Sequence, residues 1–181
     1  MVVVRESKDF SLHFSQIAKQ YRYLRATDVE PIIYIMQRLN SRLNLPHIDA
    51  ADIGCGDGRY SLLLSKYLDG KLQLRCVDNN EHMLETLASY LNTNGVRKFQ
   101  SVKADAESLP FGDNSLDCVV TFNAVHHFKL GDFWSRVPGF SETGGYFSFI
   151  PEHQVRTAGI SGAGISLSSI RKRLVFITWM R

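Results

Sequence analysis

Acidic, amide and imidazole side chains stand at the ends of four apolar segments of this chain. Asp52 ends the first segment, Asp78 the second and Asp105 the third, and residues 123–127, Asn-Ala-Val-His-His, follow the fourth. Carboxylates accept hydrogen bonds from hydroxyl groups and attract ammonium groups, and a histidine can take up a proton near neutral pH. If these four ends meet in the fold, they can bind a polar small molecule and move a proton beside it.

The stretch 48–61, IDAADIGCGDGRYS, is the pattern around which these residues are organised. An apolar run comes first, Gly54, Gly56 and Gly58 follow it, and an amphipathic segment begins at once. A tight turn of this kind needs glycine, which reaches positive φ and lets a ligand approach the backbone closely. The first N–H groups of the following helix would point into the same space. The stretch therefore predicts a strand, a turn and a helix around a polar or anionic ligand.

The rest of the chain alternates strand-like apolar runs with amphipathic helical segments. We expect strands at 48–52, 72–78, 99–104, 116–122 and 146–150, and helices at 60–68, between Asn80 and Asn94, and at about 132–137. This alternation is typical of an α/β fold with a doubly wound, mostly parallel sheet and helices on both faces. Ligands bind such sheets outside the carboxyl ends of the strands, where the strand order reverses. All four polar segment ends would lie there.

Residues 1–45 are expected to form N-terminal helices. Apolar residues at helical spacing predict one amphipathic helix over 11–25 and a second from Thr27 or Asp28 to about residue 43, before Pro46. Tyr21 and Arg25 fall on one face of the first helix. Periodicity alone favours a rim aromatic and a solvated charge for this pair.

The acids at two strand ends restrict the ligand. Asp78 is placed to accept hydrogen bonds from both hydroxyls of a ribose, which indicates a nucleoside. The dinucleotide fingerprint G-x-G-x-x-G would put its third glycine where this chain has Arg59, and it does not require an acid at Asp52. An acid before the turn would repel a pyrophosphate and attract an ammonium group. A nucleoside joined to an amino-bearing group fits better than NAD, and S-adenosylmethionine is the common molecule of this kind.

Five motifs in order resemble those of class I S-adenosylmethionine-dependent methyltransferases. They are DIGCGDG at 52–58, VDN at 77–79, ADA at 104–106, LPF with DNS at 109–115, and VHHF at 125–128. The chain is most similar to the branch that contains the ubiquinone/menaquinone and biotin-pathway methyltransferases, a methyltransferase type 11 group. The N-terminal Phe14 to Arg25 segment also resembles that branch's lid helix. The resemblance covers about residues 14–150 and implies a Rossmann-like fold with strand order 3-2-1-4-5 and incomplete closing antiparallel strands.

The resemblance implies a role for each matching residue. The methionine end of the cofactor would lie against Asp52 and the glycine turn, and the sulfonium would lie beside Asn123. The ribose would bind to Asp78, and the adenine would lie against Asn79 and Asp105. Tyr21 and Arg25 would close over the carboxylate, in contrast to the interpretation from periodicity. The full predicted cofactor set is Tyr21, Arg25, Asp52, Gly54, Cys55, Gly56, Gly58, Asp78, Asn79, Asp105, Ala106, Asn123 and Ala124.

The pair His126-His127 has three interpretations. As metal ligands these residues lack a third partner nearby in the sequence, so we predict no metal site. As a catalytic group, one histidine could accept a proton from the methyl acceptor. As a structural element, one ring packs while the other caps a backbone group. The residues themselves leave the last two interpretations open.

Composition limits the class of protein. The chain has 181 residues, a formal net charge of +3 and a calculated pI near 8.8, which is too mildly basic to indicate nucleic-acid binding without a clustered patch. Neither a leader nor a membrane-spanning run is recognisable, so we expect a cytoplasmic location. Cys55, Cys76 and Cys118 are too far apart for a zinc site or a disulfide framework. A helix N-terminus could lower the pKa of Cys55, but a small filler residue is the preferred interpretation.

The C-terminal part departs from the family pattern. Trp134 to Thr143 predicts a short or irregular helix, and residues 151–181 form a divergent basic tail without Asp or Glu after residue 155. We expect room for at most one further strand there, an edge strand at 174–179, and a shortened or alternative form of the family. The basic cluster 171–173 is expected to be a solvated strand edge.

Three functions remain after this reading. The first is a methyltransferase that acts on a small-molecule acceptor, with residues 46–150 as the cofactor-binding domain. A tRNA-modifying methyltransferase and a catalytically silent S-adenosylmethionine-binding or partner-binding module are the alternatives. The sequence determines neither the acceptor nor the oligomeric state.

Overall fold

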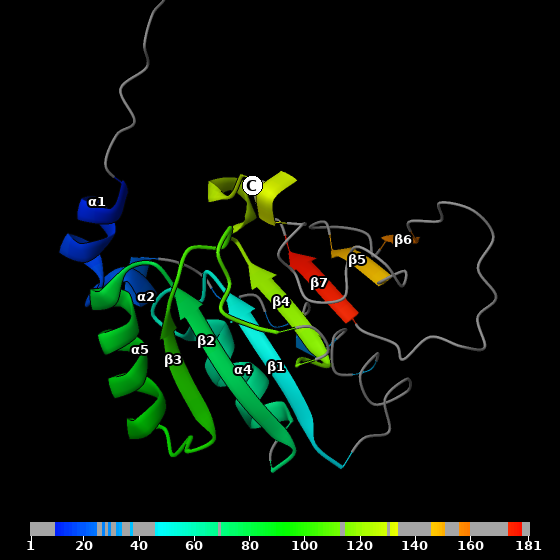
Figure 1. Ribbon diagram of the computed structural model, residues 1–181. Coiled ribbons are helices and arrows are strands. Elements are labelled where there is room, and N and C mark those ends of the chain that lie inside the picture. The colour runs from blue at the N-terminus through cyan, green and yellow to red at the C-terminus, as the bar shows by residue number, and fades with distance from the viewer. Residues whose placement is uncertain are drawn as a thin grey trace, which may run out of the picture.

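The computed structural model of the chain describes the part of it that holds the predicted turn and strands. The described residues are 10–24, 27, 29, 32–33, 37, 46–68, 70–112, 115–129, 131–133, 146–150, 156–159 and 174–178. Among them, strands and helices alternate through the middle of the chain, as the sequence predicts (Figure 1).

The elements agree closely with the predicted segments. The helices are α1 (Phe10–Ile17), α2 (Tyr21–Leu24), α4 (Arg59–Tyr67) and α5 (Glu81–Thr93), with a 3-10 turn η1 (Val125–His127). The strands are β1 (Ile48–Ile53), β2 (Leu72–Asp78), β3 (Phe99–Lys103), β4 (Cys118–Phe122), β5 (Tyr146–Ile150), β6 (Arg156–Gly159) and β7 (Leu174–Thr178). Residues 131–133 are also helical, and the rest of the helix predicted over 132–137 lies outside the described residues.

The seven strands form one sheet in the order β3-β2-β1-β4-β7-β5-β6. β1 pairs in parallel with β2 on one side and with β4 on the other, and β3 continues the sheet in parallel beyond β2. Only β6 is antiparallel to its described neighbour. The mostly parallel, doubly wound fold and the order 3-2-1-4 are confirmed. The strand order therefore reverses between β1 and β4, and ligands bind such sheets at that point.

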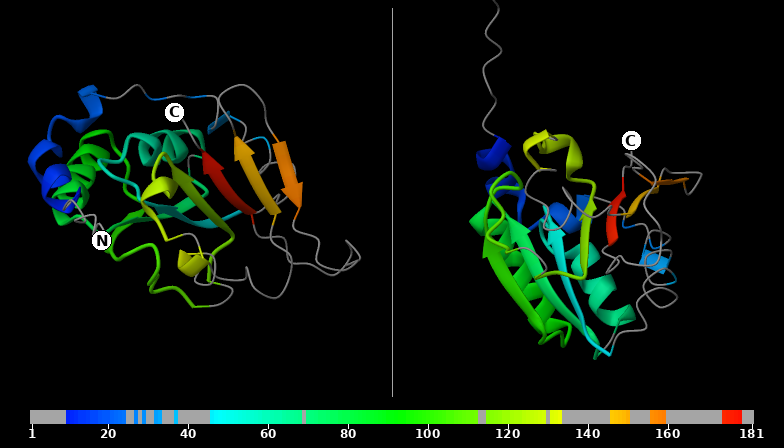
Figure 2. Two further views of the ribbon diagram at one scale, coloured as in Figure 1. Left: turned by 90° about the horizontal axis from the view of Figure 1, so that it is seen from above. Right: turned by 45° about the vertical axis from the view of Figure 1, so that its right-hand side comes forward.

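The position of β5 differs from the prediction. We expected the strand at 146–150 beside β4 and a strand at 174–179 at the edge, but β7 lies between β4 and β5 and is parallel to both (Figure 2). The tail also contributes a second strand, β6, where we expected at most one. Both β5 and β7 are inner strands of this sheet, and β7, the continuous run Leu-Val-Phe-Ile-Thr, is the one that pairs with the fully buried β4.

Two apolar clusters cover the two faces of the sheet. One face packs on α4 and α5 through residues such as Leu64, Leu87 and Leu91. The other face carries Ala51, Ile53 and Val119, and it is covered by the loop after β3 and by the segment after β4. Every residue of β4 is buried, which confirms the prediction of a central strand. Such burial on both faces stabilises the strand ends that carry the polar residues.

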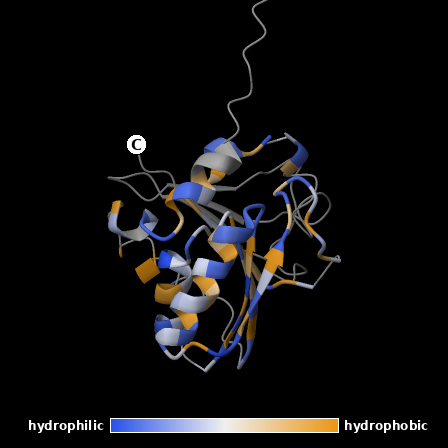
Figure 3. Ribbon diagram, turned by 90° about the vertical axis from the view of Figure 1, so that its left-hand side faces the viewer, coloured by the Kyte–Doolittle hydropathy of each residue, from blue (hydrophilic) through white to orange (hydrophobic). Residues whose placement is uncertain are grey.

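Helix α5 shows how local signals set an element that supports the site. The Asn80 side chain accepts a hydrogen bond from the Met83 N–H at 3.2 Å, so Asn80 is the N-cap as predicted. The helix ends before Gly95, which has φ of 81°. Hydrophilic and hydrophobic residues alternate along this helix in Figure 3, because only one side of it packs on the sheet.

The N-terminal segment is not one continuous helix. We predicted a helix over 11–25, whereas α1 ends at Ile17 and α2 begins at Tyr21 after a turn at 18–20. The Gln20 N–H bonds to the Ile17 carbonyl at 2.8 Å and Ala18 is buried, so the turn packs against the domain and redirects the chain. Ile32 of the second predicted helix lies in the core, and most of that helix lies outside the described residues. None of the helices among the described residues is long and apolar enough to cross a membrane.

Candidate functional site

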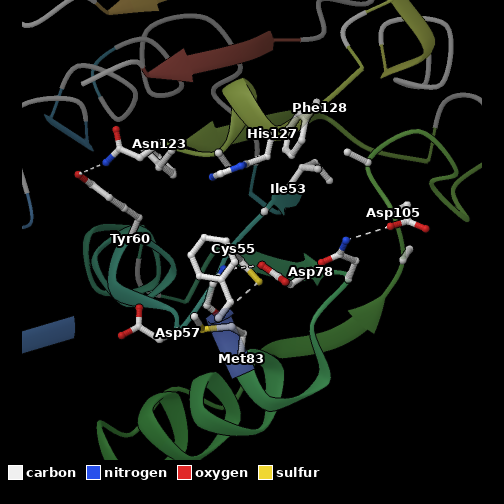
Figure 4. A pocket seen from close by; sticks show the side chains of 18 of the residues that line it. Ile53, Cys55, Asp57, Tyr60, Asp78, Met83, Asp105, Asn123, His127 and Phe128 are labelled. Atoms are coloured by element: carbon white, nitrogen blue, oxygen red, sulfur yellow. Dashed lines mark hydrogen bonds between the residues drawn. The ribbon is translucent and has the colours of Figure 1, made fainter. Parts of the chain in front are cut away.

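A cavity of about 240 Å³ opens at the carboxyl ends of β1, β2 and β4 (Figure 4). The glycine turn, the two loops after β2 and β3, and the segment after β4 contribute its walls, and α1 and α2 contribute aromatic side chains. Its lining residues are Phe14, Tyr21, Ile53, Gly54, Cys55, Gly56, Asp57, Arg59, Tyr60, Asp78, Asn79, Met83, Ala104, Asp105, Ala106, Glu107, Phe122, Asn123, Ala124, His127 and Phe128. Of the polar residues at strand ends singled out from the sequence, Asp78, Asp105, Asn123 and His127 meet here.

The glycine turn forms one wall of the cavity, and both Gly54 and Gly56 have positive φ. Gly54 has φ of 70°, and a Cβ there would lie 2.4 Å from the Cβ of Ala124. Gly56 has φ of 54°, and a Cβ there would meet nothing within 4 Å. The Gly54 and Cys55 N–H groups bond to the Val77 carbonyl at 2.8 and 3.0 Å, which ties the turn to the end of β2. The turn is therefore closely packed on the sheet side and open on the cavity side.

Asp78 connects the turn to the next strand end. Its Oδ2 accepts the Gly56 N–H and its Oδ1 accepts the Asn80 N–H, both at 2.9 Å. Burial raises the pKa of this carboxyl, and the hydrogen bonds from the backbone oppose the increase. The Asn79 N–H acts on the same carboxylate. A carboxylate has about four lone-pair sites, so these backbone bonds leave capacity for about one hydroxyl of a ligand. Asp78 can thus hold the turn and bind a ligand at the same time.

The loop after β3 supplies a second polar group further from the turn. The Asn79 amide donates to Asp105 Oδ1 at 3.1 Å, and Ala106 lies beside them in the cavity wall. Glu107 accepts the Lys129 N–H, which connects this loop to the segment after β4. Figure 4 shows Asp105 on the side of the cavity away from Tyr60, and Asn79 is joined to Asp105 by the hydrogen bond of its amide.

Asp52 lies behind the cavity wall, and not among the lining residues as the prediction required. Its side chain is 1% exposed and its Oδ2 accepts the Ser61 hydroxyl at 2.7 Å. Burial raises the pKa of Asp52 to about 7, although the Ser61 bond acts in the opposite direction. Within the described part of the chain its Oδ1 has no hydrogen-bond partner. The geometry assigns Asp52 to supporting the turn and α4.

Two other predicted residues do not line the cavity, and a third lies outside the described residues. Gly58 does not line the cavity, and a Cβ there would lie 2.8 Å from Leu87 Cγ, so this glycine lets α4 and α5 pack closely. His126 also does not line the cavity. Arg25 lies outside the described residues, and its role stays a prediction.

The segment after β4 supplies the opposite wall of the cavity. Asn123 has φ of 55°, an uncommon value for a residue other than glycine, and its amide donates to the Tyr60 hydroxyl at 3.3 Å. The Tyr60 ring stacks on Phe122 with centroids 4.5 Å apart and an interplanar angle of 8°. Asn123 and Ala124 thus lie at the cavity surface, held by α4 across from them.

His127 faces the cavity under the N-terminal helices. Its ring makes an edge contact with Phe14 at a centroid distance of 5.6 Å and lies 4.0 Å from the His126 ring. Partial burial lowers the pKa of His127, and the nearby His126 contributes in the same direction. A neutral imidazole at neutral pH can accept a proton. The described residues contain no group of three His, Cys, Asp or Glu side chains arranged to hold a metal ion.

Cys55 is a buried residue of the cavity wall and not an activated thiol. Burial raises the pKa of Cys55 well above its usual range, and Cys76 beside it adds to the increase. A thiol with a raised pKa is a poor nucleophile. The interpretation of Cys55 as a small filler residue agrees with this geometry, and the alternative of a lowered pKa is wrong.

Sequence reasoning missed several residues of the lining. Arg59 and Tyr60 follow the glycine turn directly, and their position at the start of α4 was the signal available for them. Met83 lies in the first turn of α5, and its spacing indicated only a core residue. The complete set of lining residues not predicted as cofactor-binding or catalytic is Phe14, Ile53, Asp57, Arg59, Tyr60, Met83, Ala104, Glu107, Phe122 and Phe128.

Comparison with known proteins shows what this part of the chain is similar to. Residues 50–138 match the family described as a methyltransferase domain. The chain is 36% identical over 78 residues to YcgJ of Bacillus subtilis, named as an uncharacterized methyltransferase. It is 37% identical over 70 residues to a demethylmenaquinone methyltransferase of Staphylococcus epidermidis. These matches cover 43% and 39% of this chain and 30% and 28% of the relatives.

Solved structures of methyltransferases resemble this chain in fold. The crystal structure of YcgJ superposes with a TM-score of 0.56 at 26% identity, over 70% of this chain and 53% of that one. A second structure is a methyltransferase from Aquifex aeolicus, described as dependent on S-adenosylmethionine. It superposes with a TM-score of 0.52 at 18% identity, over 68% of this chain and 72% of that one. At this identity the likeness shows the fold alone. The matched segment spans less than a third of each of these two curated relatives and about half of the YcgJ structure.

Proposed function

We propose that this chain binds S-adenosylmethionine in the described cavity and transfers its methyl group to a small-molecule acceptor. The observation that carries the proposal is Asp78, a carboxylate at the end of β2 that opens into the same cavity as the glycine turn. A ribose hydroxyl is a suitable donor for the remaining capacity of that carboxylate. The match of residues 50–138 to the methyltransferase domain family supports this cofactor over a dinucleotide.

The lining residues suggest how the chain would hold the cofactor. Asp78 would bind the ribose, and Asn79, Asp105 and Ala106 would lie along the adenine. When bound, the cofactor supplies an activated methyl group that a nucleophilic acceptor atom takes by in-line displacement. The chain's main contribution would be to hold the acceptor in line and to exclude water, and orientation of this kind can lower a barrier by up to about 7–11 kcal/mol.

His127 is the proposed proton acceptor. It lines the cavity, and its lowered pKa keeps the ring neutral at pH 7, which is the form that can remove a proton from a hydroxyl, an amine or an activated carbon. His126 does not line the cavity and would act through its ring contact with His127. An acceptor that is already nucleophilic would not need this step.

An aromatic acceptor is the first class to test. Five phenyl or phenol rings line the cavity, those of Phe14, Tyr21, Tyr60, Phe122 and Phe128. Flat rings pack favourably against such side chains. The curated relatives include demethylmenaquinone methyltransferases, and their name makes a quinol-type ring the natural first candidate for this chain.

Calorimetric titration of the purified chain with S-adenosylmethionine and S-adenosylhomocysteine tests the cofactor site. We expect binding by the wild type and a loss of roughly 10- to 100-fold in affinity in Asp78→Asn, because the substitution removes a charged acceptor worth about 1.5–3 kcal/mol. Glu85→Gln is the matched control: this carboxylate lies on the outer side of α5 with 68% of its side chain exposed. It should bind as the wild type does.

Each outcome of the titration has a distinct meaning. Equal affinity in Asp78→Asn and wild type would contradict the ribose assignment. Absence of binding by a folded wild-type chain would contradict the cofactor proposal. Binding without transfer of a radioactive methyl group to any tested quinol, phenol, amine or tRNA would favour a silent cofactor-binding module, and transfer to tRNA alone would favour the tRNA-modifying alternative.

A further inference from the structure

The cavity lining is rich in acids and holds one arginine. Asp57, Asp78, Asp105 and Glu107 contribute carboxyl groups, whereas Arg59 is the only arginine or lysine among the lining residues that the structure describes. The amino-acid end of S-adenosylmethionine carries a carboxylate. That carboxylate would be repelled by the acids and needs a cation at one defined place.

Arg59 is held at the start of α4 by three neighbouring side chains. Its Cζ lies 5.2 Å from the centroid of the Tyr60 ring and 5.6 Å from the centroid of the Tyr21 ring. Its Nε lies 4.0 Å from Asp57 Oδ1, and its side chain is 9% exposed. Two aromatic faces and one carboxylate therefore fix the plane of the guanidinium next to the cavity.

The two ends of the cavity differ in the groups they offer. Figure 4 shows Asp78 and Asp105 toward one side, and Tyr60 and Asp57, the neighbours of Arg59 in the chain, toward the other. If Asp78 binds the ribose, the adenine extends toward Asp105 and the amino-acid end extends toward α4. The carboxylate would then arrive beside Arg59.

We propose that Arg59 binds the carboxylate of the cofactor's amino-acid end and so selects cofactors that carry it. This inference rests on the proposed function and adds a residue that the sequence motifs did not indicate. A guanidinium has five N–H donors in a planar fork, so it can bind more than one acceptor at the same time. Tyr21, which stacks on the same guanidinium, couples the N-terminal helix α2 to this end of the cavity.

The test compares two ligands on matched variants. S-adenosylmethionine and its decarboxylated form differ by the carboxylate alone, and both are titrated into wild type, Arg59→Gln and Arg97→Gln. Arg97 lies at the far end of the sheet, where it donates to the Asn92 carbonyl, so its substitution controls for net charge. We expect Arg59→Gln to lose roughly 10- to 100-fold in affinity for S-adenosylmethionine and nothing for the decarboxylated form. Arg97→Gln should bind both ligands as the wild type does.

The remaining outcomes separate failure of this inference from failure of the proposed function. Wild type that binds neither ligand contradicts the cofactor itself. Wild type that binds both, with an equal loss for the two ligands in Arg59→Gln or no loss for either, refutes the role of Arg59. Because Arg59→Gln also removes the contacts to Tyr21 and Tyr60, its thermal unfolding is compared with that of Arg59→Lys. The lysine keeps the charge and should retain part of the preference for the carboxylate.

Discussion

Asp52→Asn should change how the stability of this chain depends on pH. The Asp52 carboxyl is 1% exposed, and burial raises its pKa to about 7 from an ordinary value of 3.8. Between these two values the unfolded chain releases the Asp52 proton while the folded chain retains it. The unfolded state then binds fewer protons, so the free energy of unfolding decreases as the pH increases.

The magnitude follows from the two pKa values. A difference of about 3.2 units at about 1.36 kcal/mol per unit amounts to roughly 4 kcal/mol, lost progressively from pH 4 to pH 7 and constant above it. The asparagine variant has no proton to release at this site. Relative to wild type, it should gain roughly 4 kcal/mol of stability at pH 8 compared with pH 4, which corresponds to roughly 10–15 °C in Tm for a chain of this size.

Urea unfolding of both proteins at pH 4, 5, 6, 7 and 8 measures this difference. Asp78, whose pKa is also raised by burial, contributes in the same direction in both proteins and largely cancels in the comparison. A fixed penalty for the buried amide would shift the variant equally at every pH and is therefore separable. Parallel curves for the two proteins would refute the reasoning, since they would mean that Asp52 ionises in the folded chain near its ordinary pKa.

Two further predictions concern the turn and the proposed base. Gly54→Ala should destabilise the chain by roughly 2–5 kcal/mol, because its Cβ would lie 2.4 Å from that of Ala124 at φ of 70°. Gly56→Ala should cost only about 1–2 kcal/mol of backbone strain, because its Cβ would meet nothing within 4 Å. Equal urea midpoints in the two variants would contradict the close packing at Gly54. For an acceptor that must lose a proton, the turnover rate should increase through a midpoint below pH 6.5 and stay constant above it, because only the neutral His127 accepts a proton and its pKa is lowered. His127→Asn should lose roughly 100-fold in rate together with this pH dependence, and a variant with the same kcat and profile would leave His127 a packing role.

The parts of the fold that were predicted correctly depend on short-range signals. The glycine turn, the Asn80 cap of α5 and the buried run of β4 each follow from residues within a few positions of one another. Backbone propensity and capping act over that range, so a single sequence is informative about them. The site residues at strand ends were predicted for a related reason: in a parallel sheet, the carboxyl ends of all strands meet at one edge.

The incorrect expectations depend on contacts between distant segments. Asp52 precedes the turn and was expected to face the ligand, but a strand end offers two faces, and packing against Ser61 of α4 decided that its carboxyl lies behind the wall. The N-terminal helix divides at residues 18–20 because Ala18 is buried against the domain. Neither outcome has a signal in local spacing.

The sequence alone determined the α/β class, the glycine turn and the position of acids at the carboxyl ends of the strands. These follow from periodicity, turn chemistry and the geometry of parallel sheets. The order of the first four strands came from the resemblance to a known family. Tertiary structure decided that β7 lies between β4 and β5, that Arg59 lies between the rings of Tyr21 and Tyr60, and that His127 rather than His126 faces the cavity. The physical reason is that strand neighbours and side-chain contacts depend on how all apolar surfaces of the chain pack together. A local sequence pattern carries no information about that packing.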